Sequence, residues 1–304
     1  MKKFYQKKEK HIAESYAYHK RAIPVKILSS LSKRTQFKEQ PYKIKGSHGK
    51  AITVPTRVTP ALAEFLGFIM ADGNLKASSY SIRFYNQEDA LIQRFSTLCN
   101  ELFSIEPYVY KHTKKNLHIA QVDSKALFDL VTALGIPSEG KSYQAHIPKI
   151  ILQSADSSIS AFLSAYIDCD GSVDVTGSRV EINSRSRRFI EEASFAFLRL
   201  GIITKIEKVK TGKTSRIWIS SQRELKNLLR YCTLRGEKRH LVKNAVKSKH
   251  YSSLDQIPVP VFVRNFFKKN LGLIHSTVKL RLSPYAHGHN KNISAYALQG
   301  YALQ

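Results

Sequence analysis

Two stretches of the chain are apolar almost throughout, and each ends in Asp-Gly. They read FLGFIMADG over residues 65–73 and LSAYIDCDG over residues 163–171. An apolar run without a polar face predicts a buried helix. A hydroxyl followed by a proline, Thr59-Pro60, indicates where the first helix begins, so we expect it over 60–72. Gly73 fits a left-handed cap at the end of that helix.

An alternating pattern follows each apolar stretch at the same distance. Apolar residues stand ten and twelve positions after each final aspartate, and they are Ile82, Phe84, Val180 and Ile182. Alternation of apolar and polar side chains predicts strands with one buried face. Further elements follow in similar order in the two halves. The first half predicts a helix over 89–102, a hairpin of 108–110 with 117–120, and a helix over 125–134. The second half predicts helices over 159–170 and 186–200, a hairpin of 204–210 with 216–219, and helices over 222–231 and 238–249.

The matching order and spacing predict an internal duplication. We therefore expect an α+β fold in which two pseudo-symmetric αββαββα repeats pack through their apolar helices, with antiparallel sheets. The expected domains are a basic N-terminal arm or helical module over 1–53, a first repeat over 54–155, a second repeat over 156–255, and a basic, mostly helical extension over 256–304.

Charge narrows the class of partner. The chain has 49 basic and 23 acidic residues and a net charge of +26. Such an excess is typical of proteins that bind polyanions, above all nucleic acid. A membrane surface is the rival, but no long basic amphipathic helix supports it. Residues 1–50 hold fourteen basic and three acidic residues, which indicates an arm on a phosphate backbone, with a solvated tail as the alternative.

The cysteines indicate the compartment. Cys99, Cys169 and Cys232 lie far apart, without a CxxC pair, so they predict neither a zinc site nor a disulfide framework. The basic N-terminus lacks the apolar core of a signal peptide, and no apolar run is long enough to span a bilayer. We expect an intracellular protein of the cytoplasm, nucleoid or an organelle matrix, not a secreted one.

The polar faces of the predicted strands carry side chains that can read base edges. If the two sheets combine into one concave saddle, that surface presents Arg83, Tyr85, Gln87, Arg179, Glu181, Asn183, Lys208, Arg216 and Trp218. Arg, Gln, Asn and Glu recognise bases in the major groove of DNA, and a β-ribbon fits that groove. The alternative is that these are ordinary solvated strand faces.

At this point the two stretches resemble the paired LAGLIDADG motifs of homing endonucleases. The resemblance covers about residues 54–244, because both motifs, their spacing and the order of elements agree. It implies that the two motif helices cross through small residues, here Gly67 and Ala165. Leu66 departs from the usual small residue opposite Ser164. Met70 replaces the first Asp of the motif, which Asp168 keeps in the second copy.

The resemblance also implies a metal site. The final motif acids fall on Asp72 and Asp170, beside Gly73 and Gly171, and carboxylates of this kind hold Mg²⁺ or Mn²⁺ together with phosphate and water. An Asp-Gly that merely caps a buried helix is the alternative.

A basic residue near each metal is also implied. Lys141 follows Asp72 by 69 residues and Lys238 follows Asp170 by 68, which is nearly the same distance. Each could polarise the attacking water or offset phosphate charge, the alternative being a solvated turn lysine. Gln87 is a further candidate near the first acid.

These features predict a monomeric, metal-dependent endonuclease that cuts both strands of a long, asymmetric DNA site. The main alternative is a nucleic-acid-binding protein on the same scaffold that does not cleave, either an RNA maturase bound to intron RNA or a DNA-binding regulator. A basic RNA-associated structural protein is a third reading. Similar domains occur in inteins, but the chain begins Met1-Lys2 and ends at Gln304, and Asn290 precedes Lys291. We therefore expect no splicing chemistry, while an excised intein fragment stays an alternative.

Overall fold

The structure is a computed structural model that describes residues 42–46, 49–113, 115–174, 179–208 and 214–247, with 256–258, 265, 269 and 292–294. Most of the predicted N-terminal arm and C-terminal extension therefore lie outside the described residues. Two short antiparallel pairs of strands precede and follow the repeats in the chain, namely β1 (Tyr42–Ile44) with β2 (Ile52–Val54), and β11 (Gln256–Pro258) with β12 (Asn292–Ser294). Among the described helices, none has the length and apolar character needed to cross a membrane.

The first repeat has the predicted αββαββα order. Its elements are α3 (Pro60–Asp72), β3 (Gly73–Lys76), the 3₁₀ turn η1 (Ala77–Ser79), β4 (Ser81–Asn86), α4 (Asp89–Phe103), β5 (Tyr108–Lys111), β6 (His118–Asp123) and α5 (Lys125–Ala133), followed by the short helices α6 (Lys141–Gln144) and α7 (Lys149–Leu152). The strands form one antiparallel sheet in the order β3-β4-β6-β5.

The second repeat follows the same order. Its elements are α8 (Asp156–Asp170), β7 (Gly171–Val173), β8 (Val180–Ser184), α9 (Arg187–Arg199), β9 (Lys205–Lys208), β10 (Ser215–Ile219), α10 (Gln222–Tyr231) and α11 (Gly236–Lys247). The sheet order β7-β8-β10-β9 repeats that of the first sheet, strand for strand. The predicted duplication and the predicted α+β fold class are therefore confirmed.

Local sequence signals account for several of the boundaries. Helix α3 begins where the hydroxyl of Thr59 accepts a hydrogen bond from the amide of Leu62 at 3.2 Å, and a proline occupies the first turn. Ser124 caps α5 through the amide of Leu127 at 3.3 Å. Each cap satisfies an amide that has no partner within its helix.

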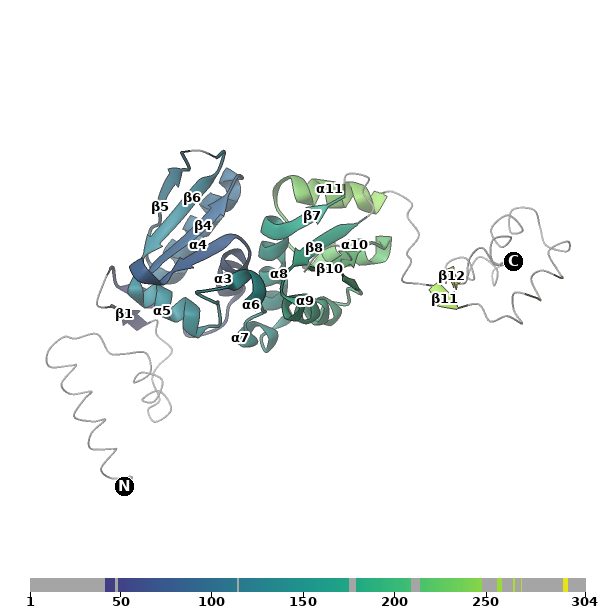
Figure 1. Cartoon of the computed structure of the whole chain (residues 1–304), viewed down its shortest axis with the longest axis horizontal. Helices are drawn as coiled ribbons and strands as arrows, with labels where there is room; N and C mark the ends of the chain where they lie inside the picture. Colours follow the sequence, from purple (N-terminus) through teal and green to yellow (C-terminus); the bar gives the residue numbers. More distant parts are fainter. Residues whose placement is uncertain are drawn as a thin grey trace, which may run out of the picture.

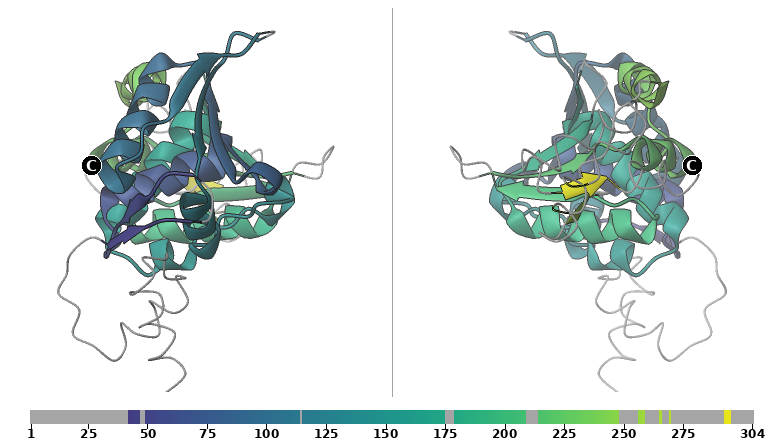
Figure 2. Two further views of the ribbon diagram at one scale, coloured as in Figure 1. Left: turned by 90° about the vertical axis from the view of Figure 1, so that its left-hand side faces the viewer. Right: turned by 90° about the vertical axis from the view of Figure 1, so that its right-hand side faces the viewer.

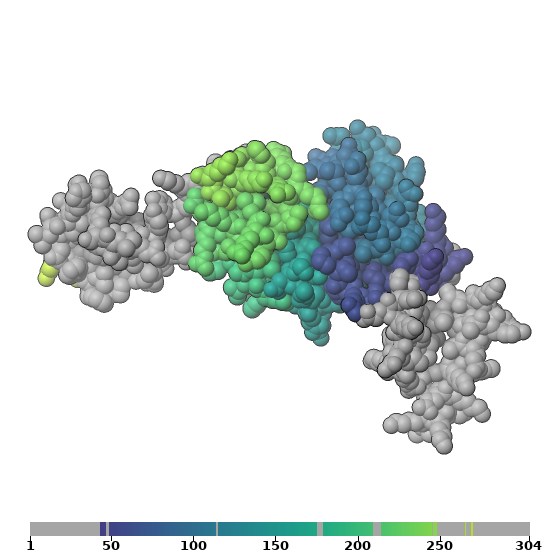
Figure 3. Space-filling view, turned by 180° about the vertical axis from the view of Figure 1, so that it is seen from behind, coloured from purple at the N-terminus to yellow at the C-terminus, as the bar shows by residue number. Residues whose placement is uncertain are grey.

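The two repeats meet along α3 and α8, which lie between the sheets (Figure 1). Both helices are buried around most of their circumference, as their apolar sequences predict. In each repeat the amphipathic helix, α4 or α9, packs on its own sheet. Seen from behind, the blue and green surfaces of the two repeats touch along a continuous boundary (Figure 3).

Small residues allow α3 and α8 to approach closely, as expected. A Cβ on Gly67 would lie 2.5 Å from the carbonyl oxygen of Phe162 and 2.9 Å from the Cβ of Ala165. Leu66 is fully buried, so it is accommodated at the crossing although it departs from the motif. Stacked phenylalanines complete the first core, with Phe65 and Phe84 each packed on Phe95 at ring distances of 5.4 and 4.8 Å.

The prediction of a left-handed cap at Gly73 is wrong. Its φ of −81° is that of extended backbone, and Gly171 has the same geometry at −75°. These glycines serve close packing instead. A Cβ at Gly171 would lie 2.6 Å from the carbonyl oxygen of Ile167, and one at Gly73 would overlap Ile69 in the same way. The chain can thus pass directly from each motif helix into a strand.

Candidate functional site

Asp72 and Asp170 are the last residues of α3 and α8, and the crossing of these helices brings their carboxylates within electrostatic reach of each other. Burial raises the pKa of Asp72, and the negative charge of Asp170 raises it further. Burial also raises the pKa of Asp170, against the opposing effects of Lys141, Tyr166 and Lys238. Two acids that repel each other form a site that is stabilised by positive charge.

The two predicted lysines occupy equivalent places. The Nζ of Lys141 donates to backbone carbonyls at the end of α3, those of Ile69 (3.1 Å), Ala71 (2.6 Å) and Gly73. The Nζ of Lys238 donates to the carbonyls of Ile167, Asp168 and Cys169 at the end of α8, at 3.0, 2.7 and 3.0 Å.

Each lysine therefore caps the C-terminal end of one motif helix, where carbonyls lack intrahelical partners and the helix dipole favours a cation. Burial lowers the pKa of Lys141, opposed chiefly by the charges of Asp170 and Asp72. The alternative of a solvated turn lysine is thus wrong for both positions. Their part in catalysis stays a prediction.

The residue beside Asp72 is Asn86, not the predicted Gln87. The Nδ2 of Asn86 donates to Oδ2 of Asp72 at 2.9 Å, and the Oδ1 of Asn86 accepts from the amide of Glu88 at 2.9 Å. Gln87 is exposed one position beyond the end of β4. Counting could have found the pair, because Asn86 and Ser184 each follow their aspartate by fourteen residues.

The second acid has different neighbours. Asp170 hydrogen-bonds to the hydroxyl of Tyr166, which also hydrogen-bonds to Ser184. The position equivalent to Tyr166 in α3 is Phe68, which has no hydroxyl. The thiol of Cys169 instead hydrogen-bonds to Asp72 across the helix pair. The two carboxylates are therefore held by different partners.

The polar face of the second sheet centres on Trp218. Arg179 and Arg216 each lie 4.4 Å from its ring centre, and Lys205 lies 5.3 Å away. Both arginines also pair with Glu181, at 4.0 and 3.5 Å. Cation–π contacts and ion pairs together hold these side chains in place.

One predicted member of this face lies elsewhere. In the register of β9 on β10, Lys208 pairs with the buried Ser215, whereas Lys205 pairs with Trp218. Because side chains alternate along a strand, Lys208 belongs to the opposite face and Lys205 takes its place. Asn183 is exposed and donates to Glu181 at 2.8 Å.

The first sheet presents a second polar face. Arg83 on β4 pairs in register with Gln121 on β6, and Tyr85 with Ile119. The sequence did not single out Tyr108 and Tyr110 on β5, whose rings stack at 5.2 Å. The hydroxyl of Tyr110 donates to Gln121 at 3.0 Å. The strands of the two sheets run in different directions in Figure 2.

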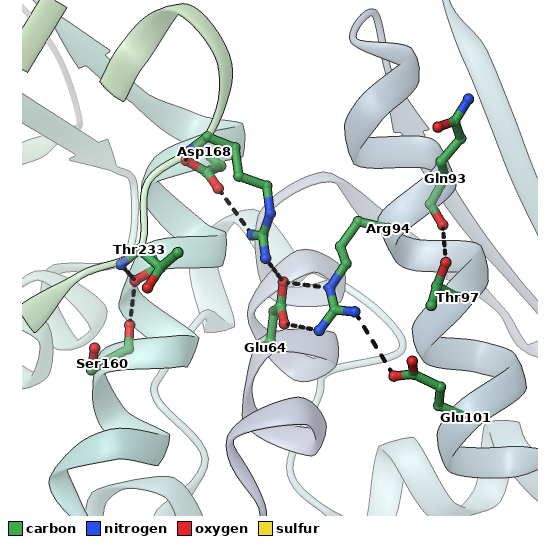
Figure 4. A network of polar contacts seen from close by, with 10 residues as sticks. Glu64, Gln93, Arg94, Thr97, Glu101, Ser160, Asp168 and Thr233 are labelled. Atoms are coloured by element: carbon green, nitrogen blue, oxygen red, sulfur yellow. Dashed lines mark hydrogen bonds and ion pairs between the residues drawn. The ribbon is translucent and has the colours of Figure 1, made fainter. Parts of the chain in front are cut away.

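Asp168, the first acid of the second motif, is structural. It is buried and accepts from the amide of Arg235 at 3.0 Å and from its guanidinium at 3.4 Å. Arg235 also pairs with Glu64 at 2.6 Å, which in turn forms a two-pronged pair with Arg94 (Figure 4). Burial raises the pKa of Asp168 to about 6. Met70, at the matching place in α3, is buried without any such partner requirement.

The residues present fit a divalent cation. Two neighbouring carboxylates with raised pKa values offer hard oxygen ligands, and a metal would offset their mutual repulsion. Among the described residues no group of three or more His, Cys, Asp or Glu side chains could enclose a metal. Such an arrangement suits an ion that keeps water and phosphate as further ligands. Mg²⁺ and Mn²⁺ meet this description.

Comparison with known proteins agrees with the motif assignment. Residues 157–233 match the family described as a LAGLIDADG-like domain. The second repeat therefore resembles a LAGLIDADG-like domain, and the resemblance inferred from the paired motifs is confirmed. The first repeat has the same order of elements and the same sheet.

Solved structures with some likeness include the homing endonuclease I-DmoI in complex with DNA and Mn. It has a TM-score of 0.46 and 16% identity over 59% of this chain and 100% of that one. A full-length DUF199/WhiA protein from Thermatoga maritima has the same score and identity over 74% of this chain and 71% of that one.

Curated relatives carry unrelated names. The chain is 35% identical over 188 residues to a protein of the A-type ATP synthase of Pyrococcus abyssi, matching 61% of this chain. It is 30% identical over 175 residues to the small subunit of replication factor C of Methanocaldococcus jannaschii, matching 55% of this chain. The match spans only 18% and 9% of the length of these two relatives.

Proposed function

We propose that this chain is a site-specific DNA endonuclease that hydrolyses one phosphodiester bond in each strand of its target. The observation that carries the proposal is the pair of neighbouring carboxylates, Asp72 and Asp170, at the ends of two crossed helices. Both come from one chain, so a monomer would carry both acids. A cap for a buried helix does not require a second acid at the same place.

Asp72 and Asp170 would hold the metal, with Mg²⁺ or Mn²⁺ as the candidates, and Gly73 and Gly171 directly follow them in the chain. When bound, such a metal activates water and stabilises the leaving oxygen in hydrolysis of a phosphodiester. Lys141 and Lys238 would keep the ends of α3 and α8 in place and add positive charge near the scissile phosphates. Asn86 would orient Asp72, and Tyr166 would orient Asp170.

The polar sheet faces would read the target sequence. Arg216 is paired with Glu207 at 3.0 Å as well as with Glu181, so its guanidinium is not a free phosphate-binding charge. Fixed donors beside fixed acceptors suit base edges in the major groove, whereas the large net positive charge supplies attraction to the backbone. On the first face Arg83 and Tyr85, with the newly placed Tyr108 and Tyr110, are the corresponding candidates.

The relatives support a function of this segment that does not depend on the protein in which it is found. The matched segment is a small part of two proteins with unrelated names, one belonging to an ATP synthase and the other to replication factor C. A segment shared by such different proteins has a function that is independent of theirs. We infer a mobile endonuclease module, associated with an intein or an intron, and place it in an intracellular compartment where it meets DNA.

Cleavage of a randomised DNA target library in Mg²⁺ tests the proposal. We expect wild-type protein to select and cut a long site, and Asp72→Asn or Asp170→Asn to bind the same site while cutting is abolished. A matched control is Asp129→Asn, because Asp129 lies on α5 in an exposed pair with Lys125. Selective DNA binding without any cleavage would refute the enzymatic proposal and favour the non-cleaving DNA-binding regulator. Preference for intron RNA over DNA would favour a maturase.

A further inference from the structure

The segment that carries Lys141 is held by hydrogen bonds between its residues 143–147 and the second repeat, and we call this set of contacts a clasp. Just after Lys141, the hydroxyl of Tyr143 accepts a hydrogen bond from Nη1 of Arg185 at 2.9 Å, and the same guanidinium lies 5.3 Å from the tyrosine ring centre. The Oγ of Ser186 donates to the carbonyl of Ala145 at 2.5 Å.

A third bond extends this clasp. The Oε2 of Glu192 accepts from the amide of Ile147 at 2.7 Å. Ser186 caps α9 and Glu192 lies on it, with Arg185 directly before, so the clasp belongs to the N-terminal part of one helix. The three bonds hold the backbone or side chains of residues 143–147, so the clasp acts on the lysine segment and not on the acids themselves.

The segment that carries Lys238 is clasped by the first repeat. Arg235, three residues before Lys238, pairs with Glu64 on α3 at 2.6 Å. Gly236, at the start of α11, lies so close to the carboxylate of Glu88 that a Cβ there would be 2.5 Å from Oε2. A carboxylate at the N-terminus of a helix is electrostatically favourable.

The two clasps are related by the internal duplication. Glu88 follows Asp72 by sixteen residues and is the N-cap of α4, while Ser186 follows Asp170 by sixteen residues and is the N-cap of α9. Both contact the lysine-bearing segment of the other repeat. The chemistry of the contact differs between the halves, but its place in the fold is the same.

We propose that each of the two lysines is positioned by the opposite repeat, with Ser186, Arg185 and Glu192 as the positioning residues for Lys141, and Glu64 and Glu88 as those for Lys238. A local change in one repeat then loosens the lysine of the other. The consequence for DNA cleavage rests on the proposed function, whereas the consequence for the lysines themselves does not.

The reactivity of the two amines tests the clasp directly. Full-length protein is acetylated with an amine-selective reagent, and the rate at Lys141 and at Lys238 is followed by peptide mass spectrometry. Loss of one buried hydrogen bond lowers the free energy of local opening enough to raise the rate of a protected amine about tenfold. We expect Ser186→Ala to accelerate acetylation of Lys141 and not of Lys238, and Glu64→Gln to do the reverse.

Ser221→Ala is the matched control. Ser221 caps α10 by accepting from the amide of Glu224 at 3.0 Å, so its loss removes a buried cap from the second repeat without touching either lysine segment. It should change neither rate. Tyr143→Phe removes only the hydroxyl that Arg185 contacts, at a largely exposed side chain, and provides a variant that folds; it should accelerate Lys141 alone.

Three outcomes would overturn the proposal. They are faster acetylation of the lysine in the mutated repeat, equally faster acetylation of both lysines, and no change of either rate in any variant. Cleavage adds a separate readout. On a target whose strands carry different fluorophores, Ser186→Ala and Glu64→Gln should slow opposite strands, and slowing of the same strand by both would also overturn it. If the protein cuts no DNA at all, only the proposed function fails, because the acetylation rates still decide whether the clasp exists.

Discussion

Gly67→Ala tests whether the crossing of α3 and α8 controls the stability of the molecule. In a helix that packed loosely, this change would stabilise the protein by roughly 1 kcal/mol, because alanine is the better helix former. Here the added Cβ would lie 2.5 Å from the carbonyl oxygen of Phe162, a backbone atom of the facing helix that cannot rotate away. It would also lie 2.9 Å from the Cβ of Ala165.

The size of the effect follows from that distance. Ordinary van der Waals contact for a Cβ begins near 3.4 Å, so the two helices must separate locally by roughly 0.9 Å. A gap of that size removes about a quarter to a half of the dispersion energy of the atoms along the crossing. Overpacking of a tight interior costs about 1–3 kcal/mol, and a rigid backbone contact belongs at the upper end. After the gain in helix propensity, we expect a net loss of about 2 kcal/mol.

Urea denaturation followed by circular dichroism measures this loss as a lower midpoint with an unchanged slope. The double variant Gly67→Ala, Ala165→Gly should show favourable coupling, because it removes the 2.9 Å contact but leaves the 2.5 Å one. A Gly67→Ala protein that is more stable than wild type would refute the reasoning, since the helices would then not be in contact at this residue.

Three further predictions concern the acids, the metal and the sheet face. The pKa of Asp72 is raised above its ordinary 3.8, so ionisation of this residue opposes folding, and its contribution to stability falls as pH rises from 3.8 through the folded pKa. Asp72→Asn should therefore gain stability relative to wild type over that pH range and keep the gain at pH 7, as measured by urea denaturation in EDTA. A variant less stable than wild type at pH 7 would contradict this. Mn²⁺ should raise the melting temperature of the wild-type protein, by the equivalent of about 2.7 kcal/mol at a hundredfold excess over Kd, and EDTA should reverse the rise. An equal rise in the double variant Asp72→Asn, Asp170→Asn would show that the metal binds elsewhere. Trp218 is the only tryptophan in the sequence, so tryptophan fluorescence reports on this sheet face, and it should change when target DNA binds. A DNA-dependent signal that persists in Trp218→Phe, or unaltered emission in the bound wild type, would place the DNA away from this face.

Elements with strong local signals were predictable to within a residue or two. Helix α3 runs from Pro60 to Asp72, as the Thr59-Pro60 start and the Asp-Gly end indicate. The alternation around Ile82 and Phe84 corresponds to β4, with both side chains fully buried. Such features depend on capping and on the period of the side chains, which act over a few residues. The short strands β3 and β7 were not singled out, because three or four residues carry too little pattern.

The errors in the candidate site arose where partners come from distant parts of the chain. Gln87 and Asn86 are adjacent polar residues, and only the end of β4 beside α3 makes Asn86 the one that reaches Asp72. Lys208 and Lys205 are both basic, but the register of β9 on β10 determines which of them lies beside Trp218. A shift of one residue in register exchanges the two faces of a strand, and no short stretch of sequence specifies it.

The sequence by itself determined that there are two repeats, which acids end the two central helices, and that lysines stand at matching distances from them. Apolar continuity, the Asp-Gly ends and equal spacing are properties of the chain itself, so the sequence shows them without any knowledge of the fold. Only the tertiary structure decided that Lys141 and Lys238 cap those helices, that Asn86 and Tyr166 hold the two acids differently, and that each lysine segment rests on the opposite repeat. These relations join residues far apart in the chain, and they exist only once α3 and α8 have packed at Gly67.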